Sequence, residues 1–160
     1  MKTAIPQFLI LVLSVWFGLL QSTHGVNPPP DGGYPLGNTA EGEDALFSLT
    51  ANGAANTAIG SHALFHTTTG DDNTAVVFFA LNFNTTGSKN TASGYHALFS
   101  NQTGRANTAT GFEALNDNTS GIQNTATGAG ALERNETGVR TPPAVMGRSL
   151  VTQKAVTISH

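Results

Sequence analysis

The side chains that could bind a metal ion or transfer protons are few and widely spaced. His62 and His96 occupy equivalent positions two repeats apart, which corresponds to about 9.6 Å in a stack of strands. Ligands at that separation cannot share one metal ion, because each metal–ligand bond spans only about 2 Å. His66 lies closer to His62, but Asp71 and Asp72 would have to fold back to complete a site. We expect His66 to face solvent, and we expect no bound metal or other cofactor.

Glycoside hydrolysis would need two facing carboxylates. The acidic residues of the second half of the chain occur singly instead, as Glu113, Asp117, Glu133 and Glu136. A nucleophile elbow, a phosphate-binding loop and a zinc-ligand spacing are all missing from the sequence. We therefore expect no enzymatic activity.

A tandem repeat fills residues 38–140 and contains all these residues. The triplet Asn-Thr-Ala begins six segments; the second starts 18 residues after the first, and each later one starts 17 residues after its predecessor. The shared pattern is Asn-Thr-Ala-x-Gly-x-x-Ala-Leu, then a polar run and a second Gly. A fixed period of this size indicates stacked units rather than a globular domain.

Six positions of the repeat never vary, and two of them are Ala. The Asn residues, which we expect to form a ladder of stacked carboxamides, are Asn38, Asn56, Asn73, Asn90, Asn107 and Asn124. The Thr residues after them are Thr39, Thr57, Thr74, Thr91, Thr108 and Thr125. The Leu residues, which we expect to point inward, are Leu46, Leu64, Leu81, Leu98, Leu115 and Leu132. The second Gly residues, where we expect positive φ, are Gly53, Gly70, Gly87, Gly104, Gly121 and Gly138.

The repeat is too short for a helix pair, which needs about 33 residues, and its Asn, Thr and Gly content disfavours helix. Two short strands per unit, joined by Gly and Asn turns, fit the pattern better. Stacking such units at about 4.8 Å predicts an all-β protein, a parallel β-solenoid of about six 17-residue coils.

One Leu per coil makes a thin core. A buried Leu contributes roughly 1.5 to 3 kcal/mol, whereas ordering each residue costs roughly 1 to 2 kcal/mol. Hydrogen-bonded ladders and association between chains must therefore add stability. Phe47, Phe65 and Phe99 form an additional apolar column beside the Leu column. We predict a homo-oligomer and favour a trimer.

The third repeat is irregular, because Val76, Val77, Phe78 and Phe79 replace the usual x-Gly-x-x. These residues are a candidate contact patch for a partner. We favour the interpretation that they thicken the core locally or form an oligomer contact, since such side chains are usually buried.

The runs at residues 56–60 and 90–98 resemble the head repeats of YadA-type trimeric autotransporter adhesins. They are also similar to the Asn-Thr-Ala-x-Gly repeats of bacterial tail-fibre-like surface proteins that end in an endosialidase-type self-cleaving chaperone. The resemblance covers about two thirds of the chain. It implies a left-handed β-roll, assembled as a trimer on a cell or phage surface, that binds host or matrix molecules. No stalk, anchor barrel or chaperone segment is recognisable after Arg140, which suggests a short or truncated member.

Residues 1–25 have the layout of a secretory signal peptide, with Lys2 at the start and an apolar run from Ile5 to Leu20. That run contains Pro6 and is shorter than the roughly 20 apolar residues of a spanning helix. We expect cleavage before Val26, no stable membrane span afterwards, and a secreted or cell-surface location. Residues 26–37 form a Pro/Gly-rich linker, and the chain has no Cys for disulfides.

The tail at residues 141–160 leaves the repeat pattern. Pro142 and Pro143 are expected to stop the array, and residues 155–158 to form a capping strand. Four glycosylation acceptor patterns recur every 17 residues, and we interpret their Asn residues as turn residues: Asn84, Asn101, Asn118 and Asn135.

Together these features predict a non-enzymatic secreted or cell-surface repeat protein that acts as an adhesin-head-like structural or binding rod for a host, matrix or glycan ligand. The net charge of −3, without a dense basic patch, argues against nucleic acid. Two alternatives stay open. The Thr column could form a flat ice- or carbohydrate-binding face, provided that its hydroxyls point outward. The chain could also be a fragment without a function of its own.

Overall fold

A computed structural model describes residues 35–50, 52–139 and 144–145. The predicted signal peptide, most of the linker and the predicted strand at residues 155–158 lie outside this part of the chain. After a 3-10 turn, η1 (Pro35–Gly37), the elements are all strands. They are β1 (Thr39–Glu41), β2 (Thr57–Ile59), β3 (Thr74–Val76), β4 (Thr91–Ser93), β5 (Thr108–Thr110), β6 (Thr125–Thr127) and β7 (Ala144–Val145).

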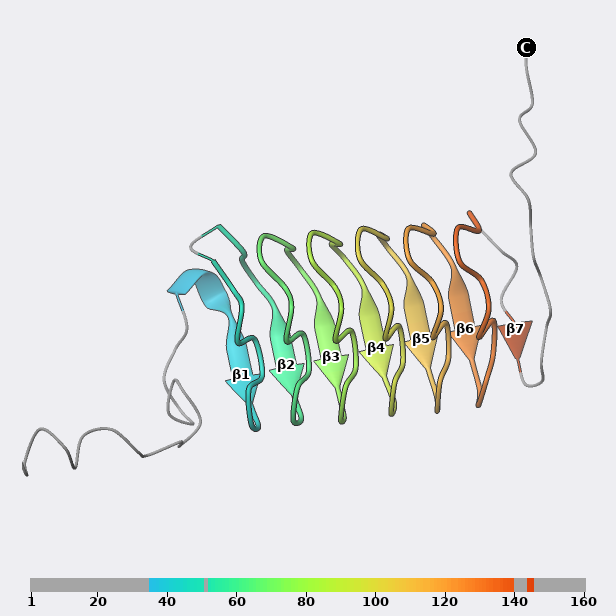
Figure 1. Ribbon diagram of the computed structural model, residues 1–160, viewed down its shortest axis with the longest axis horizontal. Coiled ribbons are helices and arrows are strands. Elements are labelled where there is room, and N and C mark those ends of the chain that lie inside the picture. Colours follow the sequence, from blue (N-terminus) through green and yellow to red (C-terminus); the bar gives the residue numbers. More distant parts are fainter. Residues whose placement is uncertain (1–34, 51, 140–143, 146–160) are drawn as a thin grey trace, which may run out of the picture.

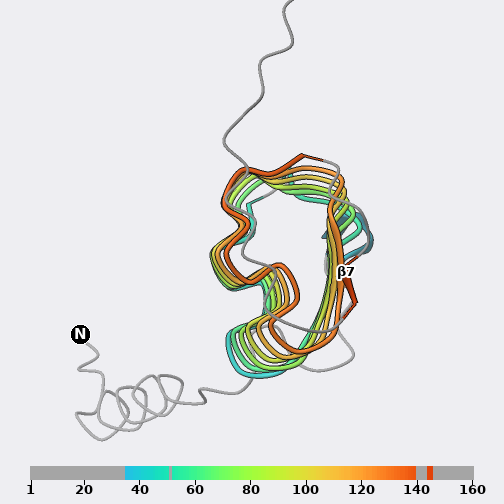
Figure 2. The same cartoon turned by 90° about the vertical axis from the view of Figure 1, so that its right-hand side faces the viewer.

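The seven strands form one parallel sheet in chain order (Figure 1). Identical positions of successive repeats pair with one another, as Thr57 pairs with Thr74 and Ala58 with Ala75. Seen along the axis, the coils lie almost on top of one another (Figure 2). The predicted all-β parallel solenoid with a repeat of about 17 residues is confirmed.

Each coil contains one strand, so the expectation of two strands per repeat is wrong. The return segment of the coil is a series of turns, because residues such as Leu64 and Leu81 adopt positive φ and interrupt the extended chain. Neighbouring coils still bond through their backbones there. Leu64 N–H donates to the carbonyl of Ala80 at 3.1 Å, and His66 N–H donates to that of Asn82 at 3.0 Å.

The core is a narrow column of Ala and Leu inside the coils. The strand residue Ala58 and the return residues Ala63 and Leu64 have no exposed surface, and the same positions are buried in every repeat. Small Ala side chains let the sheet and the return segment approach closely, so a single Leu per coil fills the space between them.

The second Gly column does not have positive φ, contrary to the sequence-based expectation. Positive φ occurs instead at the first Gly of most repeats, for example Gly60 and Gly111. At Gly104 the requirement is space, because an added Cβ would collide with Asn101 Oδ1 and lie 2.6 Å from the carbonyl oxygen of Gly121. The second Gly column is therefore needed for close packing of coil on coil.

Strand β7 continues the sheet beyond the repeats. Ala144 pairs with Ala126 of β6, and Val145 pairs with Thr127. Pro142 and Pro143 were expected to stop the array, but strand pairing resumes directly after them.

Candidate binding surfaces

The invariant Asn column forms a continuous ladder of hydrogen bonds inside the rod. Asn73 shows the pattern: its Nδ2 donates to Asn56 Oδ1 at 3.0 Å and to the carbonyl of Gly87 at 2.9 Å. Its backbone N–H donates to the same Asn56 oxygen at 3.0 Å. The arrangement repeats from Asn38 to Asn124. These carboxamides hold coils together and are not exposed to a ligand.

A second ladder lies at the glycosylation acceptor patterns and was not foreseen. Asn101 Nδ2 donates to Asn84 Oδ1, and Asn118 Nδ2 donates to Asn101 Oδ1, both at 2.8 Å. The ladder stops at Asn118, whose Oδ1 is buried without a hydrogen-bond partner, like both amide atoms of Asn135. All four Asn side chains are buried, so a glycan would have to break the packing. The recurrence of these Asn residues every 17 positions was the only sign of the ladder in the sequence, and it is equally compatible with exposed turns.

The outer face of the sheet carries the Thr column. Every strand from β1 to β6 has a buried Ala at its centre, and the Thr before it is exposed or half-buried in each case. The Thr side chains therefore point away from the core, as the flat-face alternative requires. In β5 and β6 the outward position after the Ala is also Thr, namely Thr110 and Thr127.

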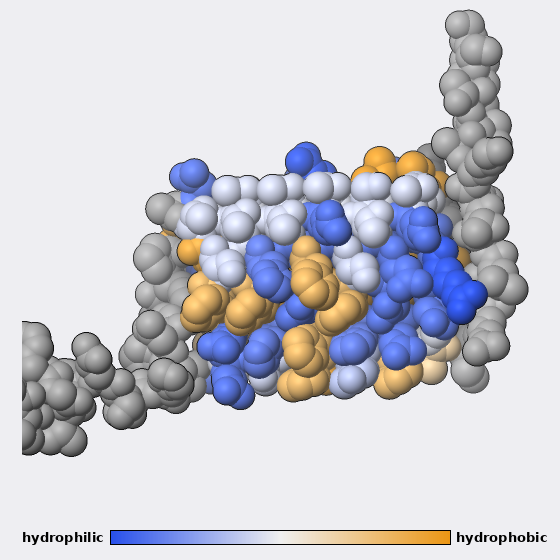
Figure 3. All heavy atoms as spheres, viewed as in Figure 1, coloured by the Kyte–Doolittle hydropathy of each residue, from blue (hydrophilic) through white to orange (hydrophobic). Residues whose placement is uncertain are grey.

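The return segments form a second outer surface, which we call the aromatic face; it comprises residues 43–48, 61–66, 78–83, 95–100, 112–117 and 129–134. Figure 3 shows apolar side chains gathered over its N-terminal and central coils and hydrophilic ones over its C-terminal end. Phe47 and Phe65 stack with ring centroids 5.1 Å apart, and Tyr95 and Phe112 stack at 5.4 Å. The rings thus make contacts from coil to coil along the rod.

The irregular third repeat lies partly on this surface: Phe78 and Phe79 belong to it, whereas Val76 ends β3 and Val77 connects the two. Val77 and Phe78 are 44% and 41% exposed, so the interpretation of a locally thicker core is wrong for them. Val76 and Phe79 are half-buried. The Phe79 ring lies 5.0 Å from the His62 ring and 5.5 Å from the His96 ring. The four residues remain a candidate contact patch.

The histidines are embedded among rings rather than grouped around a metal. Phe79 separates His62 from His96, and the His66 ring stacks on Phe83 at 4.9 Å. Burial lowers the pKa of His96, and the negative charge of Glu113 partly opposes this. Within the described residues, no group of three or more His, Asp and Glu side chains could hold a metal ion.

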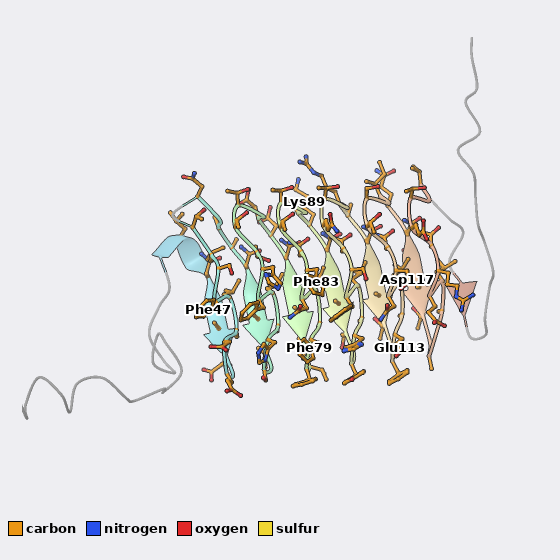
Figure 4. All side chains as sticks on the ribbon, in the orientation of Figure 1. Phe47, Phe79, Phe83, Lys89, Glu113 and Asp117 are labelled. Atoms are coloured by element: carbon orange, nitrogen blue, oxygen red, sulfur yellow. The ribbon has the colours of Figure 1, made fainter. Side chains whose placement is uncertain are left out.

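Charged groups gather at the C-terminal end of the aromatic face, where Glu113 and Asp117 are labelled in Figure 4. Partial burial raises the pKa of Asp117, and Glu133 and Glu136 raise it further, while Arg134 lowers it. These acids, which stand singly in the sequence, therefore influence one another in the fold. At the other end, Asp44 Oδ2 lies 3.8 Å from His62 Nε2.

The fold defines this protein as a parallel β-solenoid with two ladders inside and two patterned faces outside. No family model, curated protein or solved structure matches the chain. The described residues contain no helix that is long and apolar enough to cross a membrane.

Proposed function

We propose that this chain is a non-enzymatic rod, secreted or held at the cell surface, that presents regular columns of side chains to a host, matrix or glycan ligand. One observation carries the proposal. The buried carboxamides bond mainly within the rod, whereas Thr and aromatic side chains repeat outward on every or nearly every coil. Within each column the side chains are spaced at about 4.8 Å, and this regular spacing suits a repetitive ligand. The resemblance to adhesin heads supports adhesion or structural display.

The proposal includes export and self-association. The mature chain is expected to begin at Val26, which the intact mass of the exported protein would test. Association between copies follows from the thin core, because one Leu per coil contributes little and exposed rings remain outside it. The resemblance favours a trimer.

Binding of the full chain to immobilised matrix proteins and to a glycan array tests the proposed function. We expect saturable binding to at least one of these surfaces. If the sheet is the binding face, the double variant Thr91→Lys/Thr108→Lys will lose this binding, because two long cations would stand on the flat Thr column. Gln102→Lys adds a cation at an exposed position away from the strands and serves as the control. No binding to any matrix protein or glycan would contradict the proposal.

A second candidate function is binding of ice or an ordered carbohydrate by the Thr face. The outward orientation of the Thr column specifically favours it, because a straight parallel sheet holds these hydroxyls in a regular row. Inhibition of ice recrystallisation and pull-down on crystalline cellulose are the two assays. Activity in either that disappears in Thr91→Lys/Thr108→Lys but not in Gln102→Lys would support this function. Inactivity in both would reject it.

A further inference from the structure

We infer that the aromatic face is the contact between two copies of this chain that lie antiparallel, related by a two-fold axis perpendicular to the rod. The inference deepens the proposed self-association and names its partner and geometry. It rests on the extent of exposed ring surface and on the way charge is distributed along the face.

The exposed rings form an extended apolar surface. Phe47 is 64% exposed, Phe112 is 53% exposed, and Phe78 and Phe83 are each 41% exposed. At about 200 Å² per aromatic side chain, these four rings and Tyr95, which is 39% exposed, together expose roughly 480 Å². That is more than half of the roughly 800 Å² that each partner buries in a standard interface.

Two rows of the face pair an imidazole in one coil with a carboxylate in another. His62 and His66 lie in the coil that begins with β2, and Glu113 and Asp117 lie in the coil that begins with β5. His62 and Glu113 occupy the same position of the repeat, as do His66 and Asp117. The first coil adds the carboxylate of Asp44, whose Oδ2 lies 3.8 Å from His62 Nε2.

An antiparallel pair makes these rows complementary. A two-fold axis midway between the coils of β3 and β4 places the β2 coil of one copy opposite the β5 coil of the other. Side chains at one position of the repeat then face side chains at the same position in the second copy. His62 then meets Glu113 of the second copy, and His66 meets its Asp117. By symmetry each contact forms twice. At the centre, Phe79 faces His96 of the second copy, so the interface has an aromatic core with polar pairs at its edges.

A parallel arrangement lacks this complementarity. Copies that run in the same direction hold the same coil at the same height, so the carboxylates of Glu113, Asp117 and Glu133 gather with their counterparts. Like charges placed together at an interface cost free energy and select against that pairing. The charge pattern therefore favours an antiparallel pair over the trimer expected from the sequence resemblance.

The imidazoles of His62 and His66 pack mainly against rings of their own chain. His62 faces Asp44 and Ser61 and the rings of Phe65, Phe78 and Phe79. His66 faces the rings of Phe65 and Phe83. In the pair, each gains a carboxylate from the second copy.

Spin-label distances between copies test the geometry directly. The chain has no Cys, so a single label can be introduced by Ser48→Cys in the first coil or by Ser100→Cys in the fourth. An antiparallel pair offsets the two Ser48 sites by about 24 Å along the rod and the two Ser100 sites by about 5 Å. We expect a dimer by sedimentation equilibrium and a much longer distance for Ser48→Cys than for Ser100→Cys. Equal distances, a trimer or a monomer would each overturn the inference.

Charge exchange between copies gives an independent test. His62→Glu/His66→Glu places acids opposite acids in its own dimer, and Glu113→Lys/Asp117→Lys places lysines opposite imidazoles. Each double variant should dimerise at least tenfold more weakly than the unaltered chain, and a mixture of the two should form a heterodimer. Lys89→Glu changes an exposed charge outside this face and is the control (Figure 4). Failure of the mixture to pair would overturn the antiparallel register.

The two proposals can fail separately. A monomer that binds matrix or glycan would overturn the dimer and the proposed self-association but leave ligand binding by the rod standing. A dimer with the expected label distances that binds no ligand would support the inferred pair and overturn ligand binding.

Discussion

At the scale of single residues, the ladders explain why Asn recurs without exception. A carboxamide carries both a donor and an acceptor, so identical side chains can bond to one another in a column. Asp would bring a charge into the interior, and Ala would leave the backbone groups unpaired. In the first ladder each central Asn oxygen accepts two hydrogen bonds, one from a side chain and one from a backbone N–H. The residue is therefore required chemically at every coil.

Replacement of a central ladder residue tests this requirement. Asn90→Ala removes the acceptor for the backbone N–H of Asn107, at 3.0 Å, and the donor to the carbonyl of Gly104, at 2.8 Å. Leaving several buried polar groups unpaired should lower the free energy of unfolding by roughly 3 kcal/mol or more. Urea unfolding followed by circular dichroism measures the change. The exposed amide in Gln102→Ala is the control, with an expected effect under about 0.5 kcal/mol. Equal effects of both variants would contradict the role of the ladder.

The pH dependence of stability should show the electrostatics at Asp117. Its raised pKa means that the folded chain holds this proton more tightly than the unfolded chain, whose reference value is 3.8. The contribution of Asp117 to stability is therefore present below pH 3.8 and is lost as the pH rises through the raised pKa.

Asp117→Asn removes this dependence, so the variant should gain stability relative to the unaltered chain as the pH rises from about 3 to about 7. Arg134→Gln, which removes the cation that lowers this pKa, should steepen the dependence. Urea unfolding at several pH values measures both effects. A stability difference for Asp117→Asn that shrinks with rising pH would show that the sign is wrong.

At the scale of the coil, the return segment depends on residues with positive φ. His62 and Leu64 have φ of 58° and 53°, and the corresponding residues of the other coils repeat this alternation. Residues other than Gly adopt this backbone conformation only when the surrounding contacts impose it. Coil-to-coil hydrogen bonds and the buried Leu supply those contacts.

Val77 is the place where the coil is strained. It occupies the position of the first Gly with φ of 92°, which is unfavourable for a β-branched residue. Val77→Gly should raise the free energy of unfolding by about 1 kcal/mol, because the relieved strain outweighs the added freedom of the unfolded chain. Val76→Gly, in the adjacent half-buried strand position, should lower it by about 1 kcal/mol. A urea midpoint that falls for Val77→Gly would contradict the assignment of strain.

The sequence predicted the coil period, the parallel stacking and the inward Leu column, because an invariant spacing requires equivalent positions to lie side by side. It did not predict that Leu64 and its equivalents have positive φ, since Leu has no preference for that conformation and only packing imposes it. For the same reason, two strands per coil were expected instead of one. The second ladder was missed because Asn84 and its equivalents are as compatible with an exposed turn as with a buried column.

At the scale of the whole molecule, stability accumulates from one coil to the next. Each coil bonds to its neighbours through the strand, two Asn columns and the return segment, so central coils are held from both sides and terminal coils from one. The outer faces contribute less to this cohesion. Their side chains can therefore differ from coil to coil, as they do on the aromatic face, which is acidic at its C-terminal end and aromatic at its centre.

Side-chain hydrogen exchange, followed by nuclear magnetic resonance on the full chain, tests most directly the claim that buried amide ladders hold the rod together. The carboxamide protons of Asn73, Asn90 and Asn107 are predicted to exchange at least about 100-fold more slowly than those of the exposed Gln102. Protection should fall towards the open end of the second ladder at Asn118 and Asn135. Ladder carboxamides that exchange as fast as Gln102 would contradict the account.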